Sequence, residues 1–269
     1  MPKIGEKELV EEALRIADEA KRGGITLRIM GGIAVRIHTH HFSKLYERLT
    51  PPRGEGGQLR DIDMVTYRSQ SGEAHKLFVE LGYRPDKLVM AYFGESRFMY
   101  HHPENLYNID LFFERLRFSH EINLGSRGKV GRLELDYPTL TLADLILGKL
   151  QIHEINEKDI RDLTVLLREH HLENNDVEDS ISLGRIASPL AQDWGFWYDA
   201  RSNLETVAKS AERYLRDDLL EKEDFNDITE KVKMILSYID EAPKSRDWLK
   251  RDSEGYRKKW WEDVEELIR

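Results

Sequence analysis

The feature of this 269-residue chain that most constrains its fold is a change of pattern at Pro138. Before this proline, short apolar segments with strand-like alternation are separated by segments with helical periodicity. After it, the apolar residues recur at the spacing of amphipathic helices. The sequence therefore predicts an α/β (α+β) protein with a mixed-sheet core in residues 1–140 and a helical C-terminal domain in residues 141–269. A polar, acidic stretch at 174–180 is a candidate sub-boundary.

The N-terminal part is predicted to contain at least three helices, at residues 6–22, 33–49 and 71–83. Strands are predicted at residues 25–30, 59–67 and 106–116, with a hairpin at 87–100 and an edge strand at 132–138. Gly31 and Gly32 are expected to break the first strand before the second helix begins. The segment 50–58 is rich in proline and glycine, which predicts a loop.

The C-terminal part is predicted to be helical throughout. Residues 141–171 give two helices joined near Glu154 to Asn156. Further helices are predicted at residues 181–192, 201–219, 224–240 and 245–268.

Composition limits the chemistry that the chain can support. It has no cysteine, which excludes disulfides and thiolate-bound metals, so a metal ion would need carboxylate or imidazole ligands. Oxygen ligands favour magnesium or manganese. The net charge of -9 argues against a protein that wraps nucleic acid, although a local basic cleft could still bind a nucleotide or an RNA end. No run approaches the ~18 to 20 apolar residues of a membrane span, and no signal peptide is evident, so we expect a cytoplasmic protein.

Two carboxylates stand one residue apart in the strand-like stretch "LRDIDMV". Side chains alternate along a strand, so Asp61 and Asp63 point to one side with Cα atoms about 6.5–7 Å apart. Like charges at this spacing repel unless a cation lies between them, which suits one or two hard metal ions. The alternative is a solvent-facing strand edge on which Arg60 or lysines screen the charge.

A third carboxylate, Asp110, lies in the strongly apolar stretch "YNIDLFF". A buried carboxylate without a partner would cost several kcal/mol, so a partner is expected. That partner is either an arginine, such as Arg97 or Arg115, or a metal shared with Asp61 and Asp63. In the second case Asp110 could also accept a proton from an attacking hydroxyl.

The order of these features adds to their weight. The di-glycine Gly31-Gly32 lies between a predicted strand and a predicted helix, where backbone N–H groups can approach a phosphate. The stretches "GGIAVRIHTHH", "RDIDM" and "NIDLFF" resemble the three active-site motifs of the DNA polymerase beta-type nucleotidyltransferase superfamily. The resemblance is closest to the Gly-Gly branch, which includes aminoglycoside nucleotidyltransferases and the nucleotidyltransferase-like toxins of abortive-infection systems. The stretch "LADLILGKLQIHEINEKDIRDLTVLL" is similar to the fourth motif of those toxins, and the resemblance covers roughly residues 25–170.

The resemblance implies a nucleotidyltransferase core and a role for each matching residue. Gly31 and Gly32 would cradle the triphosphate, and no serine follows Gly31 as in the commonest form of the family. Asp61 and Asp63 would bind two Mg²⁺ (or Mn²⁺) ions. Asp110 would complete the catalytic metal site and help to deprotonate the acceptor hydroxyl.

The fourth motif adds three candidate nucleotide-binding residues. Lys149, and Lys158 with Asp159, would contact nucleotide phosphates or the acceptor. The expected activity is Mg²⁺-dependent transfer of a nucleoside monophosphate from an NTP to a hydroxyl of a small molecule, protein or RNA. The alternatives are a non-catalytic nucleotide-binding or toxin–antitoxin partner module of the same fold, and a metal-dependent phosphohydrolase. The motifs leave the acceptor, the NTP base and the oligomeric state open.

The sequence pattern predicts structural roles for the histidines. On a continuous helix, His38 and His41 would be neighbours while His40 points elsewhere, which does not favour a metal site. His170 and His171 fall at a predicted element end, where capping and dipole interactions account for them.

Overall fold

Residue contacts divide the chain into two units, and the computed structural model describes residues 4–50, 59–128 and 131–263. Unit 1 comprises Met1–Ile37, Gln58–Leu116 and Ile122–Thr141, and unit 2 comprises His38–Gly57, Arg117–Glu121 and Leu142–Arg269. The expected mixed α/β class, with a mixed sheet and a helical C-terminal region, is confirmed. Within the described ranges, no helix is both long and apolar enough to cross a membrane.

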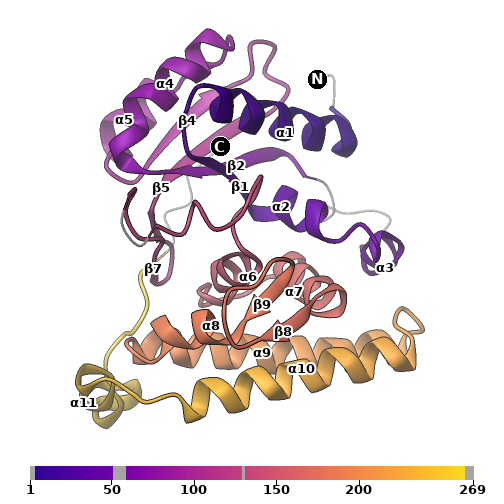
Figure 1. Cartoon of the computed structure of the whole chain (residues 1–269). Helices are drawn as coiled ribbons and strands as arrows, with labels where there is room; N and C mark the ends of the chain where they lie inside the picture. The colour runs from indigo at the N-terminus through magenta and orange to yellow at the C-terminus, as the bar shows by residue number, and fades with distance from the viewer. Residues whose placement is uncertain (1–3, 51–58, 129–130, 264–269) are drawn as a thin grey trace. The chain divides into compact units, whose positions relative to one another are not determined.

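Unit 1 is built on a five-stranded sheet with the strand order β1-β2-β5-β4-β3 (Figure 1). The strands are β1 (Leu27–Met30), β2 (Asp61–Thr66), β3 (Arg84–Pro85), β4 (Arg97–His101) and β5 (Asn108–Phe113). The central pair β2–β5 is parallel, whereas β1–β2, β4–β5 and β3–β4 are antiparallel. In β2, Ile62 and Met64 are fully buried on one face of the sheet. Asp61 and Asp63 alternate with them and therefore point to the opposite face.

The helices of unit 1 begin with α1 (Glu6–Arg22), which coincides with the predicted helix. Five of its apolar residues share one face and are fully buried: Leu9, Ala13, Ile16, Ala17 and Ala20. The other described helices of unit 1 are α2 (Gly31–His38), whose last residue belongs to unit 2, η1 (Arg68–Gln70), α4 (Ser71–Glu80) and α5 (Lys87–Phe93). The short strands β6 (Arg115–Arg117) and β7 (Glu121–Asn123) pair with each other.

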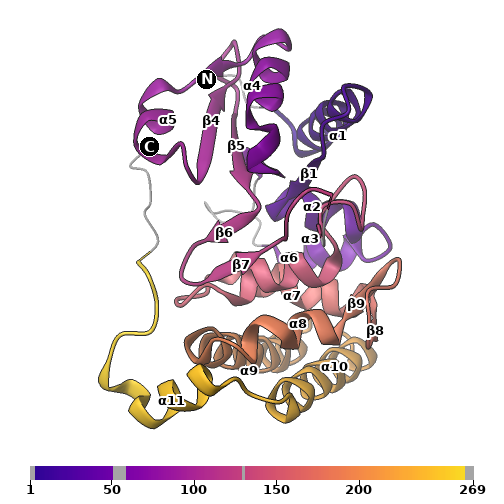
Figure 2. The same ribbon diagram turned by 60° about the vertical axis from the view of Figure 1, so that its left-hand side comes forward.

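Unit 2 is mainly helical, with α9 (Trp194–Arg216) and α10 (Lys222–Glu241) lying side by side in both views (Figures 1 and 2). Both contact α7 (Glu157–Glu169) and α8 (Leu183–Leu190), and α9 also contacts α6 (Leu142–Leu150). The other described helices of unit 2 are α3 (Ser43–Leu49), α11 (Arg246–Glu254) and η2 (Gly255–Arg257). The predicted pair of helices in 141–171, with its joint near 154–156, is confirmed.

The predicted helix 33–49 is wrong in its continuity. The chain instead forms α2 (Gly31–His38), which begins at the di-glycine itself, and α3 (Ser43–Leu49). The break is stabilised from far along the chain, because the Glu169 carboxylate accepts hydrogen bonds from the backbone N–H groups of His41 and Phe42. In a continuous helix these two N–H groups would donate to backbone carbonyls, whereas here they donate to the Glu169 carboxylate.

Two further strand predictions are wrong. The predicted hairpin 87–100 contains α5 followed by β4, because the Asp86 side chain accepts from the N–H groups of Leu88 and Val89 and caps a helix. The described residues of the predicted edge strand 132–138 form turns, and only an isolated bridge from Ile29 to Thr139 follows them.

The C-terminal predictions need three corrections. A small parallel sheet of β8 (His171–Glu173) and β9 (Ser180–Ser182) interrupts the helical pattern. The helix predicted at 201–219 begins at Trp194, where Asp193 caps it. The helix predicted at 245–268 ends at Glu254, before Gly255 with a φ of 54°. Of the predicted loop 50–58, residues 51–58 lie outside the described residues. Thr50 is the C-cap of α3.

Candidate functional site

Three carboxylates meet on one face of the unit 1 sheet. Asp63 of β2 and Asp110 of β5 are direct partners in the parallel register, and Asp61 is the partner of Asn108. Neighbouring strands lie about 4.8 Å apart and register partners face the same side, so these side chains share one short stretch of surface. Asp61 and Asp63 are half-buried, whereas Asp110 is only 2% exposed.

Gly31 lies against this carboxylate group. Met30 is the register partner of Asp63, and the chain then passes into α2 through Gly31, whose φ is 65°. A Cβ atom on Gly31 would lie 2.3 Å from Asp63 Oδ2, closer than any side chain allows. The glycine is therefore required both by its left-handed backbone and by the approach of the carboxylate. Gly32 follows as a buried residue in the first turn of α2.

The structure thus places Asn108, which the sequence prediction missed, beside the three aspartates on β2 and β5. Asn108 lies beside Asp61, and its side-chain oxygen is 2.8 Å from His101 Nδ1. His101 Nε2 in turn lies 3.1 Å from an oxygen of Asp86. The spacing of Asn108 and Asp110 is the same i, i+2 signal that singled out Asp61 and Asp63, so Asn108 could have been found from the sequence.

The predicted nucleotide-binding residues of unit 2 lie near one another on α6 and α7. The Lys149 ammonium donates to Asp159 Oδ1 at 2.5 Å and to Asp162 Oδ2 at 2.7 Å. Asp162, which the sequence prediction missed, also accepts from the Tyr46 hydroxyl at 3.1 Å. Burial alone would lower the pKa of Lys149, but the two carboxylates outweigh it and hold that pKa above its ordinary value. Lys158 is half-buried in the first turn of α7.

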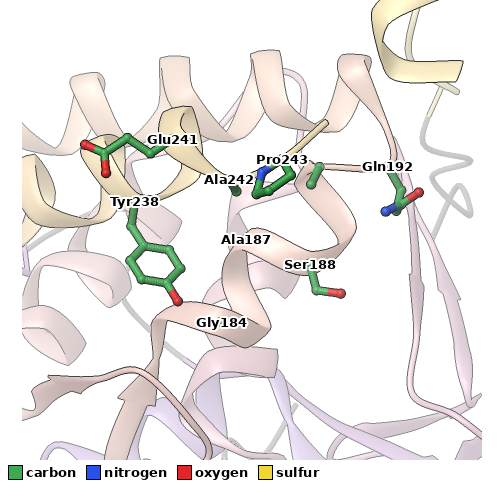
Figure 3. Close-up of a pocket in the computed structure, with 9 residues that line it drawn as sticks. Gly184, Ala187, Ser188, Gln192, Tyr238, Glu241, Ala242 and Pro243 are labelled. Carbon is green, nitrogen blue, oxygen red and sulfur yellow. The ribbon is translucent and has the colours of Figure 1, made fainter. Parts of the chain in front are cut away.

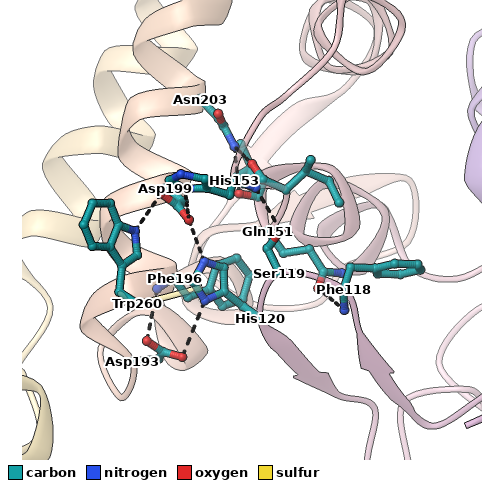
Figure 4. Close-up of polar contacts among 12 residues, drawn as sticks. Phe118, Ser119, His120, Gln151, His153, Asp193, Phe196, Asp199, Asn203 and Trp260 are labelled. Carbon is teal, nitrogen blue, oxygen red and sulfur yellow. Dashed lines mark hydrogen bonds and ion pairs between the residues drawn. The ribbon is translucent and has the colours of Figure 1, made fainter. Parts of the chain in front are cut away.

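A second polar network of unit 2 centres on Asp199 of α9 (Figure 4). Its carboxylate lies 2.8 Å from His120 Nε2 and 3.0 Å from His153 Nδ1, and it accepts from Trp260 Nε1 at 3.0 Å. Burial raises the pKa of Asp199, but the hydrogen bonds from the other three residues outweigh burial and lower it below its ordinary value. Because its charge is matched by these donors, the network ties segments of unit 2 together.

Unit 2 also contains an open pocket of about 520 Å³ between α8 and the end of α10 (Figure 3). Its lining includes Ser188 from α8 and Tyr238 from α10, with Glu241 as a carboxylate at one side. One carboxylate and isolated hydroxyl groups do not make a catalytic arrangement. The aspartates of unit 1 are therefore the better candidate site.

The residues of unit 1 fit a hard divalent cation on two observations. Three carboxylates on adjacent strands provide oxygen ligands of the kind that magnesium and manganese prefer. Gly31 keeps the space beside Asp63 free of a side chain, which leaves backbone N–H groups and a helix start close to the carboxylates. No protein-family model matches the chain, and no curated protein matches it.

Proposed function

We propose that the chain is a magnesium- or manganese-dependent nucleotidyltransferase that moves a nucleoside monophosphate from an NTP to an acceptor hydroxyl. The observation that carries this proposal is the register of β2 and β5, which sets Asp63 directly beside Asp110, with Asp61 two residues away. Gly31 supports it. Asp63 lies where a side chain of residue 31 would be, and a glycine at the start of a helix is typical of a phosphate-binding turn.

The electrostatics of the arrangement favour a cation-binding role. Like charges directly opposite each other on neighbouring strands repel each other, which is a cost to the fold that a cation can offset. Divalent ions reverse this cost by binding both carboxylates at once. In this proposal Asp61 and Asp63 hold two ions and Asp110 completes the site.

The chain's own residues then have separate tasks in an in-line displacement. Gly31 and Gly32 present backbone N–H groups at the start of α2 to the triphosphate. Asp110 accepts the proton of the acceptor hydroxyl. The hydroxyl oxygen then bonds to the α-phosphorus, and the bond from this phosphorus to pyrophosphate breaks. When bound, the two metal ions stabilise the charge on the attacking and leaving oxygens.

The role of Lys149, Lys158 and Asp159 in binding phosphates or acceptor stays a prediction. Within unit 2 the Lys149 charge is balanced by Asp159 and Asp162. A phosphate would have to compete with both carboxylates for this ammonium group. Lys158 is therefore the more available of the two lysines to an anionic ligand.

Incubation with each α-labelled NTP, Mg²⁺ or Mn²⁺ and a cell extract tests the proposal. We expect label to be transferred to one acceptor, with pyrophosphate as the other product. Replacement Asp63→Asn should reduce transfer by about 10³-fold or more, because it removes a metal ligand that acts in the transition state. Glu73→Gln, an exposed carboxylate on α4, is the matched control and should leave transfer unchanged.

The same assay separates the alternatives. Metal-dependent NTP binding without transfer would identify a non-catalytic nucleotide-binding or toxin–antitoxin partner module. Release of phosphate without labelling of an acceptor would identify a phosphohydrolase. NTP binding that needs no metal and survives the combined Asp61→Ala and Asp63→Ala replacements would contradict the proposed site.

A further inference from the structure

The histidines near the end of α2 form a group that nucleotide transfer does not use. His38 is the last residue of α2, His170 follows α7, and Asp179 precedes β9. All three belong to unit 2. One potential ligand atom from each residue lies within 4.8 Å of the others. Three separate segments of the chain therefore bring two imidazoles and a carboxylate to one point.

The hydrogen bonding of His170 fixes which of its nitrogens carries the proton. Its Nε2 atom lies 2.8 Å from the backbone carbonyl oxygen of His38. A carbonyl oxygen can only accept, so Nε2 is the donor. In the neutral ring, Nδ1 then has a lone pair. A backbone carbonyl holding the far nitrogen in this way is the usual support of a metal-binding histidine.

The lone pair of His170 is directed at a carboxylate. Nδ1 is 3.0 Å from Asp179 Oδ1, and His170 is only 3% exposed. Across the described ranges, this buried Nδ1 atom has no hydrogen-bond partner. Two electron-rich atoms at this distance repel unless a positive charge lies between them. That charge is either a second proton on His170 or a cation.

His38 favours the cation. One of its ring nitrogens lies within 4.8 Å of the ligand atoms of both His170 and Asp179. The two rings meet edge to face with centroids 5.7 Å apart. A second proton on His170 would pair only with Asp179, whereas a metal ion would use all three groups.

We infer that His38, His170 and Asp179 bind one divalent transition-metal ion, with zinc as the preferred ion. Two imidazoles with one carboxylate are a common zinc donor set, whereas magnesium prefers oxygen alone. Tetrahedral zinc ligands at about 2.0–2.1 Å from the metal lie roughly 3.3 Å apart. The 3.0 Å between His170 Nδ1 and Asp179 Oδ1 is close to that separation. The fourth position is left for water.

A neighbouring group of His40, His41 and Glu169 has a different character. Its ligand atoms also lie within 4.8 Å. However, the Glu169 carboxylate already accepts the backbone N–H groups of His41 and Phe42 at the start of α3. The His41 side chain is 72% exposed. This group therefore serves as an internal comparison for the proposed site.

The test uses the full chain, stripped of metal with a chelator and titrated with Zn²⁺ in a calorimeter. We expect one equivalent to bind, and the unfolding midpoint to rise with Zn²⁺ concentration. Co²⁺ as a second probe should give the visible absorption of a four-coordinate ion. The Asp61→Ala and Asp63→Ala background should retain this binding, which separates the site from the aspartates of unit 1.

Variants locate the site. Asp179→Asn should weaken Zn²⁺ binding at least about tenfold. Mutation of a residue that only hydrogen-bonds to a metal ligand already lowers metal affinity by about that factor. The Asp179 side chain is 74% exposed, so this variant should fold. His38→Gln should have the same effect, with circular dichroism as the check on folding. His40→Ala and His171→Ala, both exposed, are the controls and should bind as the unmodified chain does.

Three results would overturn the inference. The first is the absence of stoichiometric Zn²⁺ or Co²⁺ binding, which would leave only a His170–Asp179 ion pair. The second is binding that Asp179→Asn and His38→Gln leave unchanged. The third is binding that disappears in His40→Ala, which would move the site to the neighbouring group.

Discussion

Two groups of buried or half-buried aspartates, one in each unit, are placed in opposite ways. In unit 1, Asp63 and Asp110 are direct neighbours on parallel strands, so like charges are brought together. In unit 2, buried carboxylates lie against cations or several donors. Asp144 accepts from Arg185 at 2.7 Å, and Asp162 accepts from Lys149 at 2.7 Å.

On the proposed function, this difference separates structural acids from acids that bind a ligand. A buried carboxylate beside a cation is part of the packing, and loss of either partner leaves a charge that the interior cannot solvate. On the proposed function, carboxylates grouped with each other are kept for the cations that they bind. The comparison therefore predicts that the two kinds of aspartate respond in opposite directions to substitution.

The largest expected effect is that of Lys149→Met in unit 2. It leaves Asp159 and Asp162 as neighbouring carboxylates without the ammonium between them. We expect the free energy of unfolding to fall by about 3–5 kcal/mol, measured by urea denaturation. Lys158→Met on α7, the helix that carries Asp159 and Asp162, is the control, with a change within about 0.5 kcal/mol.

The opposite result would break the comparison in an informative way. If Lys149→Met kept its stability and lost NTP binding, Lys149 would be the phosphate ligand that the family resemblance implies. Its contacts with Asp159 and Asp162 would then be a resting arrangement that a nucleotide replaces.

Gly31→Ala should have the next largest effect. The new methyl group would meet Asp63 Oδ2 at 2.3 Å, on a backbone with a φ of 65°. We expect a loss of about 2–3 kcal/mol in the free energy of unfolding, together with loss of metal-dependent NTP binding. Gly72→Ala on α4 is the control, because its Cβ meets nothing within 4 Å. It should keep or slightly raise stability, and an equal loss in both variants would remove the special role of Gly31.

A paired acid of unit 1 gives a smaller, pH-dependent effect. Hydrogen bonds from Arg15, Tyr83 and Tyr107 lower the pKa of Glu12 from 4.5 to about 2, against the opposing effect of burial. Between these values the unfolded chain binds more protons than the folded one, so acidification from pH 4.5 to 2 destabilises the fold. With solvent screening, we expect Glu12 to account for about 1–2 kcal/mol of this loss.

Glu12→Gln tests this expectation in acid denaturation. The variant should be less stable at pH 6 and should lose less stability than the unmodified chain between pH 4.5 and 2. Glu11→Gln, an exposed neighbour on the same helix, should follow the unmodified chain. Parallel curves for all three proteins would show that Glu12 contributes nothing through its hydrogen bonds.

The sequence predicted those elements whose signals are local. Helix α1 has its own apolar face and charged ends, and the i, i+2 spacing in β2 was enough to place Asp61 and Asp63 on one side. Asp86 before α5 was a local capping signal that the hairpin prediction overlooked. The strand register that sets Asp63 beside Asp110 was not predictable, because it depends on pairing between distant segments.

Other features depend on contacts that no local pattern encodes. The break between α2 and α3 is stabilised by Glu169, which is 128 residues from His41. The same break removes the continuous helix that argued against a histidine site, and it lets His38 meet His170. Lys149 was found by resemblance. Its partner Asp162 lies in the same motif stretch, but its contact with Lys149 became visible only in the folded arrangement of α6 and α7.

The smallest expected effect, that of Asp63→Asn on stability, tests most directly whether the aspartates of unit 1 differ from the paired aspartates of unit 2. Asp63→Asn removes one of two like charges on neighbouring strands, so in chelator and low salt we expect the free energy of unfolding to rise by about 0.5 kcal/mol. Added Mg²⁺ should stabilise the unmodified chain and reverse the order of the two proteins. A double-mutant cycle with Asp110→Asn should show repulsion between the two charges: the stability gain of the double variant should be smaller than the sum of the gains of the two single variants. If Asp63→Asn instead loses more than about 1 kcal/mol in chelator, Asp63 is a structural acid like Asp162 and the distinction between the two units fails.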